Sequence, residues 1–158
     1  MSSVGYEYMS SSTDTQILTT YSSADIATIA DLLETLSPRF SDLQLDPVFL
    51  DEIIASPYHD LIVTRIDGAV VGIATLSITM GVGAGKKAYL EDFVVSHMLR
   101  GRGIGSSLWQ FISLWCKQRQ VSLYFTSRPI PSRHEAHQFY LHHGALIRET
   151  DVFTYTPK

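Results

Sequence analysis

The chain has 158 residues, 45% of them hydrophobic and 18% charged, which is the composition of one globular domain with a buried core. Its formal net charge of -4 at pH 7 excludes a broadly basic surface, and with it a nucleic-acid or anionic-membrane partner. The single cysteine, Cys116, lies in an apolar helical run, so we expect it to pack in the core. Because no internal disulfide can form, the chain suits a reducing, cytoplasmic compartment.

Residues 1–15 are rich in serine and threonine and lack the basic and apolar regions of a secretory signal peptide. We expect residues 1–15 to form a flexible tail and residues 16–158 to form a single domain. The sequence shows no internal repeat and no stretch with the composition of a linker between domains. Residues 16–20 predict the first strand of this domain.

Two amphipathic helices are predicted after this strand. Ser22 and Asp25 match a capping box at the start of the first helix, which ends at Ser37-Pro38. Asp46-Pro47 begins the second helix, and Ser56-Pro57 ends it. Both helices place apolar residues at helical spacing, so each is expected to cover a hydrophobic core.

Three apolar runs predict consecutive strands at residues 61–66, 69–79 and 89–95. Asp67-Gly68 between the first two is a strong hairpin signal, and the glycine-rich residues 81–85 predict a flexible turn before the third. The third strand carries two adjacent acids, Glu91 and Asp92, among apolar neighbours. Because side chains alternate along a strand, we expect the two carboxylates to point to opposite faces of the sheet.

The third strand runs into a stretch rich in glycine and arginine, Arg100-Gly101-Arg102-Gly103-Ile104-Gly105-Ser106. A run with helical periodicity, residues 104–119, follows directly, so the stretch lies at the start of a helix. The N–H groups of a first helical turn lack internal partners and carry the positive end of the helix dipole. Glycine also lets a ligand approach the backbone closely. We therefore expect an anion site suited to a pyrophosphate.

Two other phosphate motifs do not fit this stretch or its neighbours. A dinucleotide fingerprint needs G-x-G-x-x-G, but counting from either Gly101 or Gly103 the sixth residue is not glycine. A P-loop needs four residues between its glycines, and the candidate at residues 81–86 is one residue short. The motif that is present is R-x-x-G-x-G, beginning at Arg100.

This motif, after a strand and at the start of a helix, resembles the acetyl-CoA pyrophosphate loop of the GNAT superfamily of N-acetyltransferases. The run Leu90-Glu91-Asp92-Phe93-Val94-Val95, followed by Arg100-Gly101, resembles spermidine/spermine and related small-amine acetyltransferases in particular. The resemblance implies an α/β (α+β) fold, with a central mixed, mostly antiparallel twisted sheet flanked by about four helices. In such a fold the first two helices overhang the substrate site. This makes Phe40 and Phe49 pocket candidates, beside the interpretation that both pack in the core.

The C-terminal part of the chain predicts a further strand, a helix and two closing strands. The strand, at residues 121–126, follows the third strand and a helix at a spacing that implies a parallel βαβ unit, or strands in the same sheet. Ser132 and Glu135 match a second capping box. The helix after it resembles the second GNAT motif, whose helix borders the CoA arm, at Ala136, Phe139, Tyr140 and Gly144. Residues 145–155 predict the two closing strands.

The resemblance also assigns roles to individual residues. It implies that Glu91 is the catalytic or substrate-orienting base and that Tyr140 is the general acid. The structural alternatives are bonds to local backbone groups for Glu91, and packing or CoA stacking for Tyr140. Arg133 stands where the family usually has asparagine, and we expect it to reach a CoA phosphate. The other implied CoA-binding residues supply the backbone for the pantetheine arm or form the phosphate loop: Phe93, Val94, Val95, Arg100, Gly101, Arg102, Gly103, Ile104, Gly105 and Ser106.

Four of the six histidines fall in the helix of the second motif, at His134, His137, His142 and His143. A metal site is the alternative they suggest. However, the first two are three residues apart, not four as in H-E-x-x-H, and no carboxylate or thiolate completes a ligand set. We therefore expect a solvated helix surface and no metal.

The sequence thus predicts an acetyl-CoA-dependent N-acetyltransferase that moves an acetyl group to a primary amine of a small molecule by direct attack on the thioester. Two alternatives stay open. One is a GNAT-like module that binds CoA without turnover, for which the departure at Arg133 is the reason. The other is an acetyltransferase that acts on protein or peptide amines. The acceptor itself and a homodimer are left open.

Overall fold

The computed structural model describes residues 12–157, and they fall into two compact units that divide after Phe125. Most of the predicted N-terminal tail lies outside the described residues. Its last part does not: the first strand, β1, spans Thr13–Ile17 and so begins three residues before the expected start at 16.

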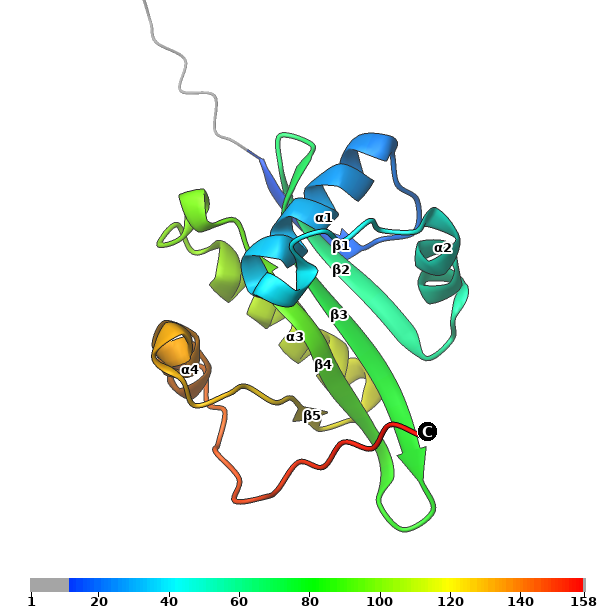
Figure 1. Ribbon diagram of the computed structural model, residues 1–158, viewed down its shortest axis with the longest axis vertical. Coiled ribbons are helices and arrows are strands. Elements are labelled where there is room, and N and C mark those ends of the chain that lie inside the picture. The colour runs from blue at the N-terminus through cyan, green and yellow to red at the C-terminus, as the bar shows by residue number, and fades with distance from the viewer. Residues whose placement is uncertain (1–11, 158) are drawn as a thin grey trace, which may run out of the picture. The chain divides into compact units, whose positions relative to one another are not determined.

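The first unit is built on a five-stranded sheet in the order β1-β2-β3-β4-β5 (Figure 1). Strands β1 to β4 pair antiparallel with one another in sequence order. The last strand, β5, pairs parallel with β4, as the predicted βαβ unit requires. The sheet is therefore mixed and mostly antiparallel, which confirms the predicted fold class. After β1 the strands are β2 His59–Ile66, β3 Ala69–Gly81, β4 Gly85–Val95 and β5 Leu123–Tyr124.

Helices lie on both faces of this sheet in the first unit, with α1 in front of the strands and α3 behind them (Figure 1). The predicted capping box starts α1: the Asp25 amide donates to Ser22 Oγ, and the Ser22 amide donates to the Asp25 carboxylate. The helical elements of this unit are α1 Ser23–Leu36, η1 Pro38–Phe40, α2 Pro47–Ala55, η2 His97–Leu99 and α3 Ile104–Arg119.

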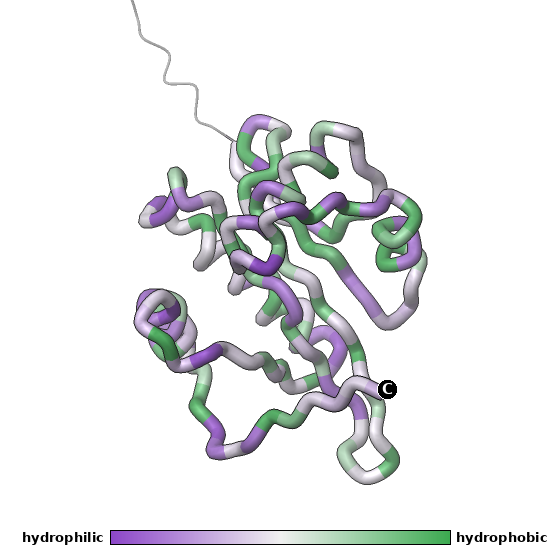
Figure 2. The backbone as a smooth tube through the Cα atoms, viewed as in Figure 1, coloured by the Kyte–Doolittle hydropathy of each residue, from purple (hydrophilic) through white to green (hydrophobic). Residues whose placement is uncertain are grey.

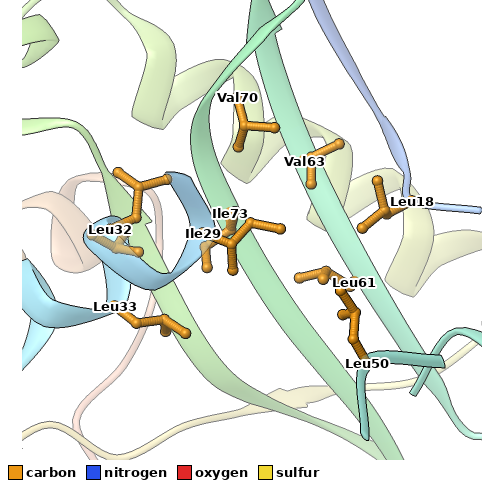
Figure 3. Close-up of a cluster of buried hydrophobic side chains, with 10 residues drawn as sticks. Leu18, Ile29, Leu32, Leu33, Leu50, Leu61, Val63, Val70 and Ile73 are labelled. Atoms are coloured by element: carbon orange, nitrogen blue, oxygen red, sulfur yellow. The ribbon is translucent and has the colours of Figure 1, made fainter. Parts of the chain in front are cut away.

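The core of the first unit fills the space between the sheet and these helices. Figure 3 shows the cluster between α1, α2 and the strands: Leu18, Ile29, Leu32, Leu33, Leu50, Leu61, Val63, Val70 and Ile73. In addition, α3 buries Leu108, Ile112 and Trp115. Each large side chain removed from water contributes about 1.5–3 kcal/mol. This core fixes β3 and β4, the strands that carry the candidate site.

The second unit contains η3 Pro131–Arg133 and α4 His134–His142, and two predictions fail in it. Ser132 lies inside η3, and Arg133 is the N-cap of α4 with no side-chain cap bond, so the predicted capping box does not form.

The predicted closing strands at 145–155 are also wrong, because residues 145–157 form no helix or strand. A strand needs a paired edge, and the regular elements among residues 126–157 are all helical. Figure 2 shows apolar residues along this segment, and several of these side chains are exposed: Leu146, Ile147, Val152, Phe153 and Tyr155.

Candidate functional site

The turn between β4 and α3 uses glycine at two positions with left-handed backbone. Gly101 has φ 76° and Gly103 has φ 80°, a region that side chains with a Cβ enter only at a cost. A Cβ built on either residue would meet no atom within 4 Å. The glycines are therefore required for the backbone conformation, and the space beside them is open.

Gly103 is also the N-cap of α3, and no side chain caps this end. The first helical bond of α3 runs from the Ser107 amide to the Gly103 carbonyl, at 2.9 Å. The amides of Ile104, Gly105 and Ser106 precede that bond, so they have no partner within the helix. The side chains of Arg100 and Arg102 on the same turn are exposed. This arrangement of amides and cations suits an anion such as a pyrophosphate.

The pairing of β4 with β5 is confined to the first half of β4. In the described chain, β5 pairs with β4 only at Ala88–Leu123 and Tyr89–Tyr124, whereas β4 continues to Val95. Beyond this pair the strands separate, and Trp109 of α3 contacts Phe93 and Phe125 edge-on, each at 5.9 Å between ring centroids. The predicted residues Phe93, Val94 and Val95 lie in this part of β4, beyond its last pair with β5.

The register of β4 against β3 is irregular at Glu91. Thr75 is opposite Asp92 and Leu76 is opposite Leu90, so Glu91 is an extra residue in a β-bulge. Ser77 Oγ donates to Glu91 Oε1 at 2.8 Å.

The bulge overturns one prediction. Asp92 is hydrogen-bonded to Thr75, and Glu91 is bonded to Ser77. Thr75 and Ser77 are two apart on β3 and therefore lie on one face of the sheet. The expectation that Glu91 and Asp92 point to opposite faces is wrong, because the extra residue breaks the alternation on which it rested.

The two acids nevertheless differ in their surroundings. Glu91 is exposed, while Asp92 is half-buried. Burial raises the pKa of Asp92 above its ordinary value; the bond from Thr75 opposes this shift, and the Glu91 charge adds to it. Sequence reasoning missed Thr75 and Ser77 as partners, because nothing in their spacing distinguishes them from other β3 residues.

The predicted acid, Tyr140, lies on α4 in the second unit, together with Arg133. Burial raises the pKa of the Tyr140 phenol above 10, and the charge of Arg133 partly offsets this. The hydroxyl therefore keeps its proton across the neutral range and can act as a donor. Glu91, Phe93–Val95 and the α3 turn belong to the first unit, so the structure brings the predicted site residues together in two groups.

The remaining sequence candidates have simpler surroundings. Phe40 packs partly against the hydrophobic core, in keeping with its packing interpretation, and Phe49 is exposed. Burial raises the pKa of the Cys116 thiol, which fits a packing residue. Two α4 histidines have local partners: His137 Nε2 bonds with Ser127 Oγ, and His143 Nδ1 donates to the Phe139 carbonyl. Among residues 12–157, no group of three or more His, Cys, Asp or Glu side chains could hold a metal ion.

A hollow of about 380 Å³ lies beside the α3 turn and is lined partly by Arg102 and Ile104. A larger one, about 460 Å³, is lined by Tyr21, Asp25 and Arg65. Glu91 lines neither of them. Within the described part of the chain, no helix has the length and apolar character needed to cross a membrane.

Several solved structures share this fold at low sequence identity. A transcriptional regulator from Bacillus halodurans C-125 is 19% identical with a TM-score of 0.75, over 92% of this chain and 100% of its own. An aminoglycoside acetyltransferase from an uncultured soil metagenomic sample is 18% identical with a TM-score of 0.73, over 93% and 99%. The ribosomal-protein-alanine N-acetyltransferase of Brucella melitensis biovar Abortus 2308 is 17% identical with a TM-score of 0.68, over 93% and 100%.

At these identities the likeness shows the fold alone. No curated protein sequence is significantly similar to this chain. The model of the acetyltransferase (GNAT) family matches residues 26–145, which span β2 to β5, the glycine turn and α4. The chain therefore belongs to the GNAT family of N-acetyltransferases, for which acetyl-CoA is the acyl donor.

Proposed function

We propose that the chain moves the acetyl group of acetyl-CoA to a primary amine of a small molecule, by direct attack of the amine on the thioester. The observation that carries the proposal is the bulge in β4. It leaves the Glu91 carboxylate exposed on the strand that leads directly into the anion-binding turn. An acceptor base and a donor site are thus built on one continuous stretch of chain.

The residues on the donor side fit CoA. The amides of Ile104, Gly105 and Ser106, with Arg100 and Arg102, would hold the pyrophosphate. The part of β4 beyond its pairing with β5, Phe93 to Val95, would bond to the pantetheine arm, and Gly101 gives the turn its left-handed backbone. We propose a phosphate contact for Arg133 as well. Acetyl-CoA supplies an acyl group that is already activated as a thioester, so the remaining chemistry is proton transfer.

Glu91 is the proposed base. An aliphatic ammonium has a pKa of about 10.4, so its neutral form at pH 7 lies about 4.6 kcal/mol uphill, at about 1.36 kcal/mol for each pKa unit. A carboxylate that takes the amine's proton, directly or through a water, lowers this barrier. Glu91 is exposed, and its hydrogen bond from Ser77 fixes its position.

Tyr140 is the proposed acid. A thiol has a pKa of about 8.5, so the departing sulfur is stabilised when a donor gives it a proton or a hydrogen bond. The raised pKa of the Tyr140 phenol supports this role, because the hydroxyl remains protonated at neutral pH. Overall, a C–N bond forms and the C–S bond breaks. The ammonium loses two protons: one goes to Glu91 and on to solvent, and the other balances the proton that Tyr140 gives to the sulfur.

The structures with this fold include enzymes named for two kinds of acceptor. Two of the similar structures carry the names of an aminoglycoside acetyltransferase and a ribosomal-protein-alanine N-acetyltransferase. Small-molecule and protein amines are therefore both acetylated by proteins with this fold. The particular resemblance to spermidine/spermine acetyltransferases remains a prediction from the Leu90–Val95 run. The exposed Glu91 favours a small, cationic acceptor over an uncharged one.

The test is thiol release from acetyl-CoA in the presence of a panel of amines, comprising polyamines, aminosugars, amino acids and peptides with a free N-terminus. We expect release that depends on the amine, with the acetylated product confirmed by mass. A chain that binds CoA but releases thiol with none of these amines would instead be a binding module. Transfer to peptides alone would move the function to protein amines.

A companion measurement tests the phosphate turn. CoA binding should raise the melting temperature of the wild-type chain by mass action. In Gly105→Val a branched side chain stands in the first turn of α3, next to the amides that would hold the pyrophosphate. Calorimetry should show CoA affinity lowered by at least about tenfold, the equivalent of about 1.4 kcal/mol. Unchanged affinity would remove the turn from the donor site.

A further inference from the structure

One face of the sheet carries a row of polar side chains that the proposed chemistry uses only at one end. Lys87 and Tyr89 alternate along β4 and share a face. Tyr89 is directly opposite Ser77 in the register, and Ser77 Oγ donates to Glu91. We name the row Lys87, Tyr89, Glu91, Asp92 and Tyr124 the β4 strip. Every member belongs to the first unit.

The far end of the β4 strip is cationic and held in place. Lys87 Nζ lies 5.5 Å from the ring centroid of Tyr89 and 5.3 Å from that of Tyr124. The two rings lie side by side, 5.8 Å apart and tilted by 32°, because Tyr89 and Tyr124 are register partners in the parallel β4–β5 pair. A cation near two aromatic faces is attracted by both, so the ammonium is fixed in position.

The near end of the β4 strip is anionic. The bulge places both Glu91 and Asp92 on this face, bonded to Ser77 and Thr75 of β3. The strip therefore runs from negative charge at the bulge to positive charge at Lys87, with the Tyr89 ring between them. Lys87 and Glu91 are four positions apart in the sequence, so their backbone positions are about 13 Å apart on an ideal strand and somewhat closer across a bulge.

We propose that the β4 strip selects the acceptor: an amine that lies at Glu91 and whose other end, at the distance that the strip spans, is an anionic group bound by Lys87. This inference rests on the proposed function and deepens it. An acceptor with a second cation at that distance meets a like charge that the tyrosines hold in place. An acceptor with a carboxylate there meets an opposite charge, and Tyr89 packs against the chain that links its two ends.

The experiment compares three linear acceptors at each of several chain lengths. All have the same terminal amine, and the other end is a carboxylate, an uncharged carboxamide or a second amine. In the wild-type chain we expect kcat/KM to be highest for the carboxylate, by about tenfold over the carboxamide. The diamine should be poorest, and the preference should be greatest at the length that spans the strip.

Two matched variants separate the contact from the overall charge. Lys87→Met removes the ammonium and keeps an unbranched stem, so the carboxylate and carboxamide should become equal acceptors. Lys86→Met makes the same change in net charge on the adjacent, exposed residue, which alternation places on the opposite face. It should keep the wild-type preference. Calorimetric titration of the carboxylate acceptor into the CoA-bound protein should show a lower affinity in Lys87→Met and an unchanged affinity in Lys86→Met.

The outcomes also separate this inference from the proposed function. Acetyl transfer to all three acceptors at equal efficiency would overturn the proposed role of the β4 strip in acceptor selection. The proposed amine acetyltransferase activity would be unaffected. An equal loss of preference in Lys86→Met and Lys87→Met would overturn it too, because the effect would then come from net charge. Absence of transfer to any amine by a chain that binds CoA would overturn both.

Discussion

The two units of the chain are held together in different ways. In the first unit, α1, α2 and α3 bury apolar side chains against the sheet. In the second, no residue between 126 and 157 is fully buried, Tyr140 is half-buried, and α4 consists mostly of hydrophilic residues (Figure 2). Local backbone bonds, such as the one from the Ala145 amide to the Tyr140 carbonyl at 2.9 Å, organise that unit instead.

The proposed roles divide in the same way. The donor turn and the base, Glu91, are built on the unit with the core, whereas the acid, Tyr140, is carried by the unit without one. A substitution in the first unit can therefore change both packing and chemistry, and the two effects must be measured separately. A substitution at Tyr140 tests chemistry with little effect on the packed core.

The largest effect on rate is expected at Tyr140. Tyr140→Phe keeps the ring and removes the hydroxyl, so kcat should fall by about 10²–10⁴ if the hydroxyl protonates the leaving sulfur. CoA affinity and melting temperature should stay near their wild-type values. In the wild-type chain, the alkaline loss of kcat should occur above pH 10, since burial raises the pKa of this phenol. A variant with wild-type kcat would leave Tyr140 with a packing role only.

The largest effect on stability separates the two units directly. Leu108 of α3 is fully buried, and Leu108→Ala should lower the free energy of unfolding by about 2–5 kcal/mol. Leu141 of α4 is 41% exposed, and Leu141→Ala should change it by less than about 0.5 kcal/mol. Denaturant titration of both variants measures the difference. Comparable losses would mean that the α4 side chain is packed as tightly as the one in α3.

A smaller and pH-dependent effect is expected at Glu91. Glu91→Gln keeps the shape and removes the charge, so transfer to an aliphatic amine at pH 7 should fall by about 10–100-fold. It should partly recover at higher pH, where more of the amine is neutral. An aniline acceptor, which is neutral at pH 7, should be much less affected. Equal losses for both acceptors, without recovery, would show that Glu91 braces the sheet and takes no proton.

The difference between the two units also explains which predictions from the sequence were correct. The capping box of α1, the hairpin at Asp67-Gly68 and the start of α3 at Ile104 all follow from local chemistry that the core reinforces. The parallel pairing of β4 with β5 was confirmed as well. The predicted strands at 145–155 had the right pattern of apolar residues, but a pattern cannot show whether a partner edge exists.

Within the candidate site, the turn was predictable and the bulge was not. Gly101 and Gly103 have positive φ angles, which glycine adopts at little cost. At Glu91 the alternation rule gave the wrong face, because a bulge depends on the register of β4 against β3 and not on the sequence of β4 alone. The neighbours Ser77 and Thr75 were missed for the same reason, and so was the pairing of Tyr89 with Tyr124.

The smallest effect concerns an ion pair that ties α1 to β2 in the first unit. Arg65 Nη1 lies 2.7 Å from Asp25 Oδ1 and also donates to the Gly68 carbonyl at 2.9 Å. The bond from Arg65, helped by those from Ser22, lowers the pKa of Asp25 from 3.8 to about 2. A carboxyl whose pKa is lowered by folding stabilises the fold at any pH above its pKa in the unfolded chain. This stability is lost as the pH falls through 3.8 toward 2.

Asp25→Asn should therefore lower the free energy of unfolding by less than about 1 kcal/mol at neutral pH, as is typical of ion pairs near the surface. The gap between wild type and variant should stay constant above about pH 5 and close between about pH 4 and 2. Melting curves across this range measure it, with Asp31→Asn, an exposed change on the same helix, as the control. A gap that persists at pH 2 would mean that Asp25 acts through its part in the capping box, since Asn alters that hydrogen bonding at every pH. A gap that closes would show that the charge itself joins α1 to the sheet, the kind of long-range tie that organises the first unit.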